Sequence, residues 1–536
     1  MSARSPLPWL ALAVAWTWPS ALHPITSAPG SPRTDLWESL WTLWFVATRL
    51  ASLQSPIRVD GLLDTPGSLW PADPVGAILV APITLSVGPA VAWTTLVIVH
   101  MTMRGWLGAR IGEACTGSAA AGWVSGAVLA VASMAISAGH NAATEALGDT
   151  WVLAVIWLGL RGPTAVEGSA RPWILLSGVL LAVSAWAHWY GGLGAFCVWA
   201  VLALRRGLAT SLRRAFAIAA VLGLVLAAPV AYAAREVSTA GDNVVGIKDP
   251  ANLARLRRNI GPADPLAFVA PAPFRSPDFT KLSRFGEDYW HSPYLGWVGI
   301  MLALGAIRGP RRWAFALVPI GVLLAIGPVL TSGGNAVILS GRRAVPLPYF
   351  LVESLPPFHS LSLLWKLGWT AQVGVAILAA EGIALLGPRV ARWAAGIAVI
   401  AVLAEARLFA PTRGLPEHVD ASIPEPILAL AAAPEGAVMS WPLIGGLPGL
   451  YEQVGHGKTL AATLNFPASK AAWKVTRAVK GGPEAAVALA RAFNIRYVVL
   501  HLDAPLTGDD SGLLLTDWAV FPILAEDARV RVLQLW

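Results

Sequence analysis

The stretch GAILVAPITLSVGPAVAWTTLVIVHMTM, residues 76–103, contains no aspartate, glutamate, lysine or arginine. A helix needs about 20 predominantly apolar residues to cross the hydrocarbon core of a bilayer. This stretch is long enough to span a membrane, and Arg104 follows it directly. Its length and composition indicate an integral membrane protein.

Further apolar runs of span length, or somewhat shorter, occur along the first 410 residues. Hydrophobic residues make up 56% of the chain and charged residues only 13%, against about 25% charged residues in soluble proteins. The predicted fold is an all-α polytopic transmembrane bundle of about eleven spans, followed by a small soluble α/β domain. With 76–103, the predicted spans are 7–22, 116–136, 149–160, 172–185, 192–204, 215–232, 294–307, 313–330, 367–386 and 393–409.

The formal net charge of +8 comes largely from arginines that lie in short clusters between these runs. This pattern is typical of membrane topology rather than of nucleic-acid binding. The short outer loops 137–148 and 186–191 contain no lysine or arginine. The positive-inside rule therefore predicts a cytoplasmic N-terminus and a tail on the outer side. The arginines assigned to inner loops are Arg104, Arg110, Arg161, Arg171, Arg205, Arg206, Arg213, Arg214, Arg308, Arg311, Arg312, Arg389 and Arg392.

Two segments of the sequence, the first apolar run and residues 36–53, each allow two interpretations. Arg4 precedes the first apolar run and Ser20-Ala21 imitates a cleavage site, so a signal peptide is an alternative to an uncleaved first span. The uncleaved span is favoured because the later loops then obey the positive-inside rule. The segment 36–53 has Trp and apolar positions at helical spacing, which predicts either a helix along the outer interface or a partly buried connecting helix.

Three predicted outer segments are long: 23–75, 233–293 and 331–366. Loops of this length usually carry a site or a small folded cap. The tail 411–536 changes character, with strand-like runs at 437–441, 496–502 and 530–536 and helical stretches at 425–433 and 483–492. The predicted organisation is a membrane domain at 1–410 and an extracytoplasmic α/β domain at 411–536. No GxGxxG, P-loop or HExxH motif occurs, and the two cysteines have no metal-ligand spacing.

Ionisable residues near the outer face are the candidates for chemistry, because charge at membrane depth is costly without a purpose. The outer loops share one side in the predicted topology, so their carboxylates and imidazoles are expected to meet in one cavity as bases or ligands. An aspartate just past a helix end often only caps a helix, and Asp73 before Pro74 fits that reading. The candidate catalytic residues are Asp35, Asp73, His140, Glu145 and Glu287, with Glu38, His188 and His291 as candidate substrate-binding residues.

Basic residues in the long outer loops form a second group of candidates. Arg258, Arg343 and Lys366 lie outside, against the topological bias. Long outer loops are exempt from that bias, so solvated charge is one reading. The other is binding of a phosphate or pyrophosphate at the level of the lipid headgroups, for which arginine has suitable bidentate geometry.

Several short motifs resemble those of the GT-C superfamily of membrane glycosyltransferases, and more closely those of the bacterial YfhO-like membrane proteins. Thr34-Asp35 with Trp41 and Trp44 is similar to a GD…W opening, with Thr in place of Gly. The other matches are Gly139-His140 (GH), Pro262-Ala263-Asp264 with Phe268 and Pro271 (PAD…P), Glu287 with Tyr294-Leu295-Gly296 (E…YLG), residues 347–358 (LPY…LPPF), Tyr451-Glu452-Gln453 with His456-Gly457-Lys458 (Y-Q…HGK) and residues 496–499 (RYVV).

The resemblance implies a sugar donor linked to polyprenyl phosphate, and a glycan, lipid or protein acceptor. It implies the bacterial inner membrane as location, and no nucleic-acid partner. Asp35 corresponds to the family's catalytic base or ligand of a divalent cation, Mg or Mn. One departure follows LPPF, where the family often has an arginine and this chain reads His359-Ser360-Leu361. Lys366 or Arg343 is then expected to hold the lipid phosphate.

Two other functions remain as alternatives. A lipid or glycan transporter predicts ionisable residues in the middle of spans and often inverted repeats. Mid-span charges are nearly absent from the predicted spans, and no repeat is visible. A non-catalytic envelope assembly protein predicts that the outer-loop carboxylates do not converge.

Overall fold

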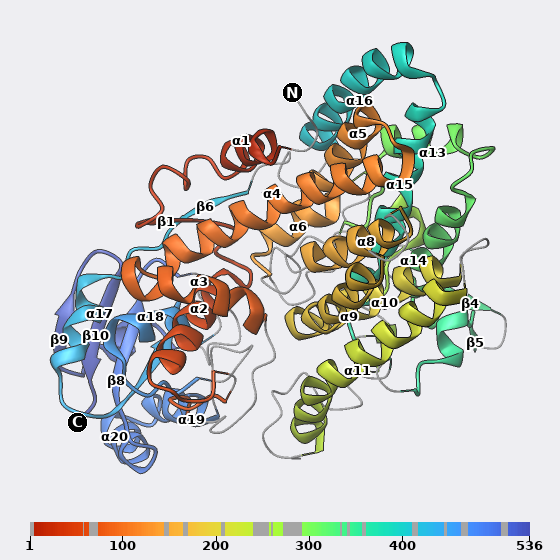
Figure 1. Cartoon of the computed structure of the whole chain (residues 1–536). Coiled ribbons are helices and arrows are strands. Elements are labelled where there is room, and N and C mark those ends of the chain that lie inside the picture. The colour runs from red at the N-terminus through yellow and green to blue at the C-terminus, as the bar shows by residue number, and fades with distance from the viewer. Residues whose placement is uncertain are drawn as a thin grey trace.

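The computed structural model describes the chain except for residues 1–4, 57, 64–72, 144–148, 165–169, 205–209, 240–253, 255–256, 259–260, 272–291, 333–334, 340–342, 356–357, 359–360, 410–415, 444–447, 463–469 and 505–512. The first 409 residues are mainly helical (Figure 1). Their α-helices are α1 (Leu7–Trp16), α2 (Leu36–Ala51), α3 (Pro74–Val87), α4 (Pro89–Thr116), α5 (Ala119–Ala130), α6 (Ser133–His140), α8 (Asp149–Thr164), α9 (Ala170–Ala187), α10 (Trp189–Leu204), α11 (Thr210–Thr239), α13 (Trp297–Gly305), α14 (Leu317–Ala325), α15 (Trp369–Ala384) and α16 (Pro388–Phe409).

Every predicted apolar run holds at least one of these helices, but the count of eleven spans is not shown. Among the described residues, three helices are long and apolar enough to cross a bilayer: Ala119–His140, Thr210–Pro229 and Leu364–Ala384. The run 76–103 is not one span. It breaks into α3 and α4 at Gly88, whose φ of +105° glycine adopts readily, and Pro89 begins the next helix.

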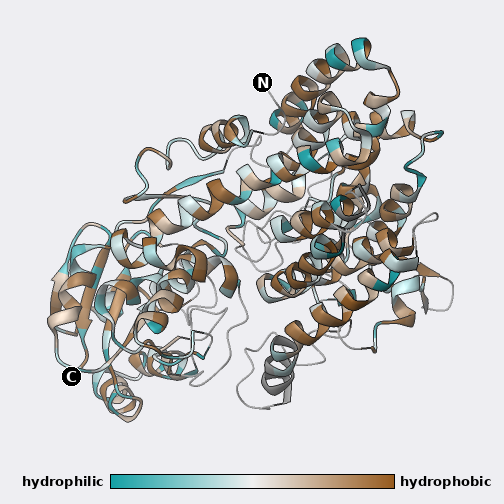
Figure 2. Ribbon diagram, viewed as in Figure 1, coloured by the Kyte–Doolittle hydropathy of each residue, from teal (hydrophilic) through white to brown (hydrophobic). Residues whose placement is uncertain are grey.

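The outer surface of the bundle is apolar where helices lack protein neighbours. On α11, Leu224 and Val225 are each 63% exposed, and on α16 Trp393 is 80% exposed. Figure 2 shows hydrophobic residues along the helices of this domain. Exposed apolar side chains over this much surface are costly in water and favourable against lipid tails. The helices therefore belong to a membrane protein.

Connecting segments that the predicted topology puts on the same side contact one another. On the predicted inner side, Arg311 Nε donates to Cys115 O at the end of α4 (2.7 Å). Arg311 N also donates to both carboxylate oxygens of Glu381 in α15, at 2.9 and 3.1 Å. Glu381 is 2% exposed, and its carboxylate caps this turn by accepting from the backbone N–H of Arg311.

The assignment of Arg104 to an inner loop is wrong. It lies within α4, is fully buried, and its Nη2 is 3.6 Å from Asp149 Oδ2 at the start of α8. The reason is the position of α4, which begins beside the outer strand β1 (Ser27–Pro29), where Trp93 Nε1 donates to Pro29 O at 2.8 Å. The middle of α4 is therefore inside the bundle, and its arginine is part of the core. With Glu381 and Glu405, it also shows that the helices hold more charge than predicted.

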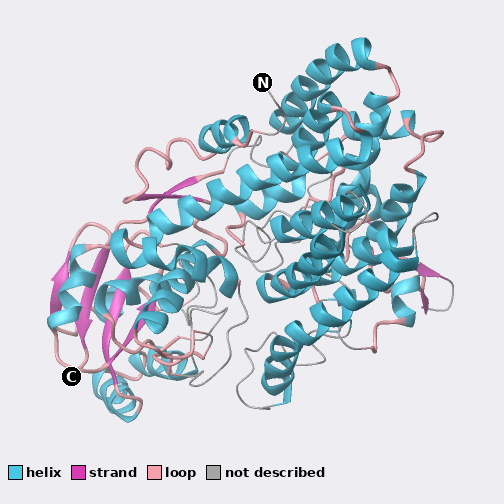
Figure 3. Ribbon diagram, in the orientation of Figure 1, coloured by secondary structure: helices cyan, strands magenta, loops and turns pink. Residues whose placement is uncertain are grey.

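The tail forms a four-stranded sheet with the order β7-β8-β10-β9 (Figure 3). β7 (Ala437–Trp441) pairs in parallel with β8 (Ile495–His501), and β10 (Val530–Gln534) pairs antiparallel with both β8 and β9 (Ile523–Glu526). Side chains of β8 alternate between two cores because helices cover both faces of the sheet. One face packs against α19 (Lys470–Val479) and α20 (Pro483–Ala492), the other against α17 (Glu425–Ala429) and α18 (Gly449–His456).

The tail is joined to the first long loop in two places. β1 pairs with β6 (His418–Asp420), and the ladder continues through Gly30 N to Glu417 O at 2.9 Å. α18 packs on α2 through the rings of Tyr451 and Trp37, 5.6 Å between centroids. Figure 1 shows α2 and α3 beside the sheet and the long helix α4 leading from there into the bundle.

The packing of α2 bears on the two interpretations predicted for residues 36–53. Trp41 is fully buried, and its Nε1 donates to Gln453 Oε1 of α18 at 2.8 Å. Gln453 Nε2 in turn donates to Gly61 O at 3.1 Å. The helix is therefore buried and connects the tail to the membrane domain, as the second interpretation predicts. The Y-Q…HGK segment of the tail forms its docking partner.

We expect the tail to lose stability at acidic pH because of the buried residue His456. Burial, and then the charge of Lys458, lower the pKa of His456 from 6.5 to about 4. The unfolded chain takes up a proton below pH 6.5 but the folded chain only below about pH 4. The free energy of unfolding should therefore fall by about 3 kcal/mol as pH drops through this window. Amide hydrogen exchange of the β7 and β8 peptides in the full-length protein measures this loss.

The matched control is His456→Asn, whose Oδ1 can still accept from Lys458 N as His456 Nδ1 does at 2.9 Å. It should remove most of the acid sensitivity. An unchanged loss of protection in this variant would assign the effect to another group.

Candidate active site

The first predicted loop and the second one meet at Asp35. Asp35 N donates to Asn141 O at 3.2 Å, and Ser31 N donates to His140 O at 2.8 Å. Ser39 Oγ, one turn into α2, donates to Ala142 O at 2.6 Å. Three consecutive carbonyls of the second loop thus hold the segment that carries Asp35. Asp35 and His140, which lie far apart in sequence, belong to one structural unit.

The carboxylate of Asp35 does not cap α2. Asp35 is at the N-cap position of that helix, yet its side chain makes no capping hydrogen bond. Asp73 and Asp264 are different: Asp73 Oδ1 accepts from Gly76 N at 2.9 Å, and Asp264 Oδ1 accepts from Leu266 N at 2.8 Å. The capping interpretation therefore describes Asp73, which is 1% exposed. It does not describe Asp35, which is partly exposed.

The GH turn has a packing requirement that explains its glycine. A Cβ on Gly139 would lie 2.3 Å from the ring of Trp16, and one on Gly30 would lie 3.0 Å from Ala142 Cβ. Gly139 therefore leaves room for the Trp16 ring of α1, and Gly30 allows the first loop to approach the second. His140 ends α6 and is 1% exposed. Glu38 lies in the first turn of α2, so it is one helical turn from Asp35.

A second group of polar side chains gathers where α8, α10 and α4 meet. His188 precedes α10, and its Nδ1 accepts from Gly191 N at 3.1 Å. A Cβ on Gly191 would lie 3.5 Å from this nitrogen and 3.7 Å from Asp149 Oδ1, so the imidazole and the carboxylate are near neighbours. Asp149 also pairs with Arg104, whose guanidinium carbon is 5.2 Å from the ring of Trp369.

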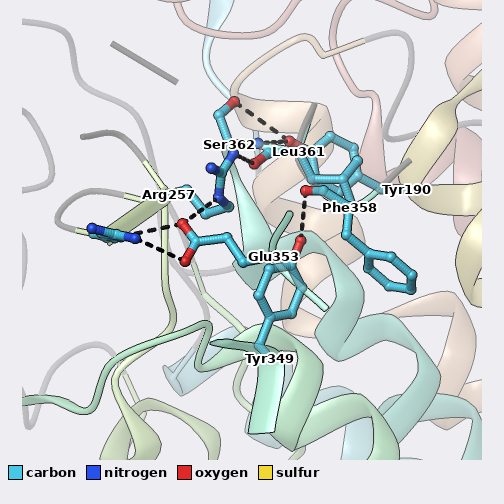
Figure 4. Close-up of polar contacts among 8 residues, drawn as sticks. Tyr190, Arg257, Tyr349, Glu353, Phe358, Leu361 and Ser362 are labelled. Atoms are coloured by element: carbon cyan, nitrogen blue, oxygen red, sulfur yellow. Dashed lines mark hydrogen bonds and ion pairs between the residues drawn. The ribbon is translucent and has the colours of Figure 1, made fainter. Parts of the chain in front are cut away.

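Tyr190 connects this group to the third long loop (Figure 4). Its hydroxyl accepts from Ser362 N at 2.8 Å and from Leu363 N at 2.7 Å. Lys366 follows in the 3₁₀ helix Leu364–Gly368, is 9% exposed, and places Nζ 5.6 Å from the centroid of the Tyr190 ring. Tyr190 therefore fixes the segment that carries the predicted phosphate-binding lysine.

Two arginines share one carboxylate beside this segment. Arg257 Nε donates to Glu353 Oε1 at 3.0 Å, and its Nη1 donates to Leu361 O at 3.2 Å. Arg258 makes a bidentate pair with Glu353 through Nε and Nη2, at 3.1 and 3.0 Å. Burial works to raise the pKa of Glu353, but hydrogen bonds from Arg258 and Arg257 outweigh it and keep this pKa below its ordinary value.

Arg258 is held but remains accessible. Its side chain is 49% exposed, while that of Glu353 is 8% exposed. The bidentate pair uses Nε and Nη2. Figure 4 shows the carboxylate of Glu353 between the two guanidinium groups.

Of the predicted site residues, the structure unites Asp35, Glu38 and His140 in one place, and His188, Lys366 and Arg258 in a connected network. Asp73 is a helix cap. Arg343 lies in the short strand β5 (Arg343–Ala344), and its side chain is outside the described part, as are Glu145, Glu287 and His291. Sequence reasoning missed Tyr190 and Glu353. The adjacent pair Arg257-Arg258 in an outer loop was the available signal, since two neighbouring buried or half-buried cations require a carboxylate.

The described residues do not by themselves form a metal site. Among them, no three His, Cys, Asp or Glu side chains gather closely enough to hold an ion. Asp35 and His140 supply at most part of a ligand set, and a divalent cation at Asp35 stays a prediction.

Comparison with known proteins was made at the level of sequence and of structure. By sequence, no family model and no curated protein matches the chain. Among solved structures, the oligosaccharyltransferase AglB from Archaeoglobus fulgidus, in complex with an inhibitory peptide and a dolichol-phosphate, is 12% identical with a TM-score of 0.51, covering 92% of this chain and 69% of that one.

The arabinofuranosyltransferase AftD from Mycobacteria is 14% identical with a TM-score of 0.58, covering 100% of this chain and 42% of that one. A second AftD structure gives 15% identity and a TM-score of 0.56. This chain thus spans less than half the length of AftD. Likeness at these identities concerns the fold. The chain shares its fold with AglB and AftD.

Proposed function

We propose that the protein is an integral membrane glycosyltransferase that moves a sugar from a polyprenyl-phosphate donor to an envelope acceptor. The reaction takes place at the outer face of a bacterial inner membrane, with the N-terminus in the cytoplasm and the tail outside. The closer relation to YfhO-like proteins is part of this proposal and rests on the short motifs. The lipid phosphate named with AglB is consistent with such a donor.

One observation carries the proposal: the carboxylate of Asp35 sits at a helix N-cap position without capping, where two outer loops are joined. A carboxylate that performs no capping role, beside a buried histidine, suits a general base. Asp35 would take the proton from the acceptor hydroxyl as that oxygen attacks the anomeric carbon. The bond from this carbon to the phosphate oxygen breaks, and the polyprenyl phosphate leaves.

The basic network supports the leaving group. Lys366 and Arg258 are held by Tyr190 and Glu353 on either side of residues 361–363. Fixed cations stabilise the negative charge that develops on the leaving phosphate. The tail, docked on α2 through α18, is placed to position the acceptor next to Asp35.

Lys366→Met is expected to raise the KM for the lipid-linked donor by roughly 10–100-fold, because one charge-assisted hydrogen bond to phosphate is lost. The measurement is transfer from a panel of polyprenyl-phosphate sugars by protein purified in nanodiscs. Lys480→Met, at an exposed lysine of the tail, is the matched control and should leave KM unchanged. Equal KM values for both variants would remove Lys366 from the site, and absence of transfer from every donor would count against the function.

A further inference from the structure

Glu405 in α16 caps a helix that belongs to a different part of the chain. Its carboxylate accepts from Trp297 N at 2.5 Å, from Val298 N at 3.1 Å and from the Tyr294 hydroxyl. The two amides are orphan donors at the start of α13, so a carboxylate there is favourable. Gly296, with φ +86°, lets the chain enter α13 beside this carboxylate. This helix cap gives the segment Tyr294-Leu295-Gly296 a structural role at the start of α13.

A small cavity lies next to this cap, at the end of the bundle that carries the predicted outer loops. Its volume is about 30 Å³, and helices α5, α13, α15 and α16 enclose it. Much of the wall is aliphatic, while Ser133, Tyr294, Gln372 and Glu405 supply polar groups. Gly296 and Ala406 are partly exposed, so the lining reaches the surface.

Gln372 is the polar group of this wall that the fold does not satisfy. It is 1% exposed, its Nε2 donates to Leu295 O at 3.4 Å, and its Oε1 has no hydrogen-bond partner. A buried amide oxygen without a donor costs about 1–3 kcal/mol. This oxygen can therefore accept from a donor that enters the cavity.

The charge and size of the cavity define that donor. The lining contains one carboxylate and no lysine, arginine or histidine. Glu405 accepts three hydrogen bonds, whereas a carboxylate has about four acceptor positions. A volume of about 30 Å³ is enough for one small polar group. These properties select a small cationic donor, namely a primary ammonium group.

We propose that the cavity between α5, α13, α15 and α16 binds the primary ammonium of an amine-bearing ligand, with Gln372 Oε1 and Glu405 as acceptors. The position at the outer ends of the helices suits the headgroup of an aminophospholipid, and a free small amine presents the same chemistry. The site is separate from the Asp35 loops, although Ser133 at its wall begins the helix that ends in His140. The inference does not depend on glycosyl transfer.

The test compares lipids that differ only in donor capacity. The purified full-length protein is reconstituted in an equal mixture of phosphatidylethanolamine and phosphatidylcholine with identical acyl chains, and retained lipid is counted by native mass spectrometry. The wild type should retain phosphatidylethanolamine with roughly tenfold preference, since a trimethylated ammonium cannot donate. Gln372→Met, which keeps the volume, and Ala406→Phe, which fills the cavity, should both abolish the preference.

Thr370→Val is the matched control, because Thr370 is a buried hydroxyl on the same helix that does not line the cavity. It should keep the preference. Glycerophosphoethanolamine added to nanodiscs of the same lipid mixture separates the two sources: loss of bound phosphatidylethanolamine supports recognition of the ammonium itself, whereas unchanged retention of phosphatidylethanolamine supports a bilayer-bound ligand. Equal retention of both lipids by the wild type, or the same preference in all variants, would overturn the proposal.

Discussion

Asp35→Asn is expected to lower the rate of sugar transfer by roughly 10²–10⁴-fold, the usual contribution of a general base. Asparagine keeps the size of the side chain but cannot accept the proton of the acceptor hydroxyl. We expect the fold to persist, because the backbone bonds of Asp35 to Asn141 O and from Ser39 N do not depend on its side chain, and the side chain does not cap α2. The defect should therefore lie in kcat, with donor binding preserved.

Two readouts make this result decisive. Transfer is measured on purified protein, and the surface glycans of a producing strain are profiled by mass spectrometry at equal protein levels. Asp264→Asn is the matched control, since asparagine caps helices as well as aspartate does and Asp264 caps the short helix Pro265–Phe268. Unchanged transfer in Asp35→Asn would exclude the residue as base, and a similar loss in Asp264→Asn would point to misfolding.

Asp149→Leu is expected to lower the free energy of unfolding by about 3–5 kcal/mol. The change leaves the fully buried guanidinium of Arg104 without its carboxylate inside the bundle, and an uncompensated buried charge is among the most destabilising defects. The double variant Arg104→Met with Asp149→Leu removes both charges and should recover a large part of this loss. Equilibrium unfolding in mixed micelles measures the three variants.

The double-mutant cycle distinguishes a pair from two independent residues. A coupling energy near zero would show that Arg104 and Asp149 act separately. A double variant as unstable as Asp149→Leu alone would show that the two polar groups are needed for reasons other than mutual compensation.

Part of the tail was predictable because its periodicity is clear, whereas α19 and β9 lie on residues for which no element was predicted. β7 and α20 occupy the residues predicted from the sequence, and β8 differs by one residue at each end. The short helix α18 was missed, because Tyr451-Glu452-Gln453 is polar for a buried segment and is satisfied only by contacts with α2. No local pattern announces a partner that lies about 400 residues away.

In the membrane domain, hydropathy located the helices but not their breaks. Gly88-Pro89 was the visible signal for the division between α3 and α4, and it was hidden inside a continuous apolar run. Arg104 was misplaced because the positive-inside rule treats an arginine as a loop residue, while tertiary pairing keeps this one in the core. For the candidate site, the sequence pointed to Asp35 and Asp73 alike as candidates, and only the structure distinguishes the carboxylate of Asp35 from the capping carboxylate of Asp73.

The β1–β6 ladder has a consequence for biosynthesis. Ser27 leaves the ribosome early, yet its pairing partner Asp420 is made only after the whole bundle has been synthesised. The loop before Asp35 must therefore wait for a segment that emerges almost 400 residues later. Contacts so distant in sequence form slowly. The surroundings of Asp35 are completed last, so a nascent or truncated chain has its helices in place before it has its site.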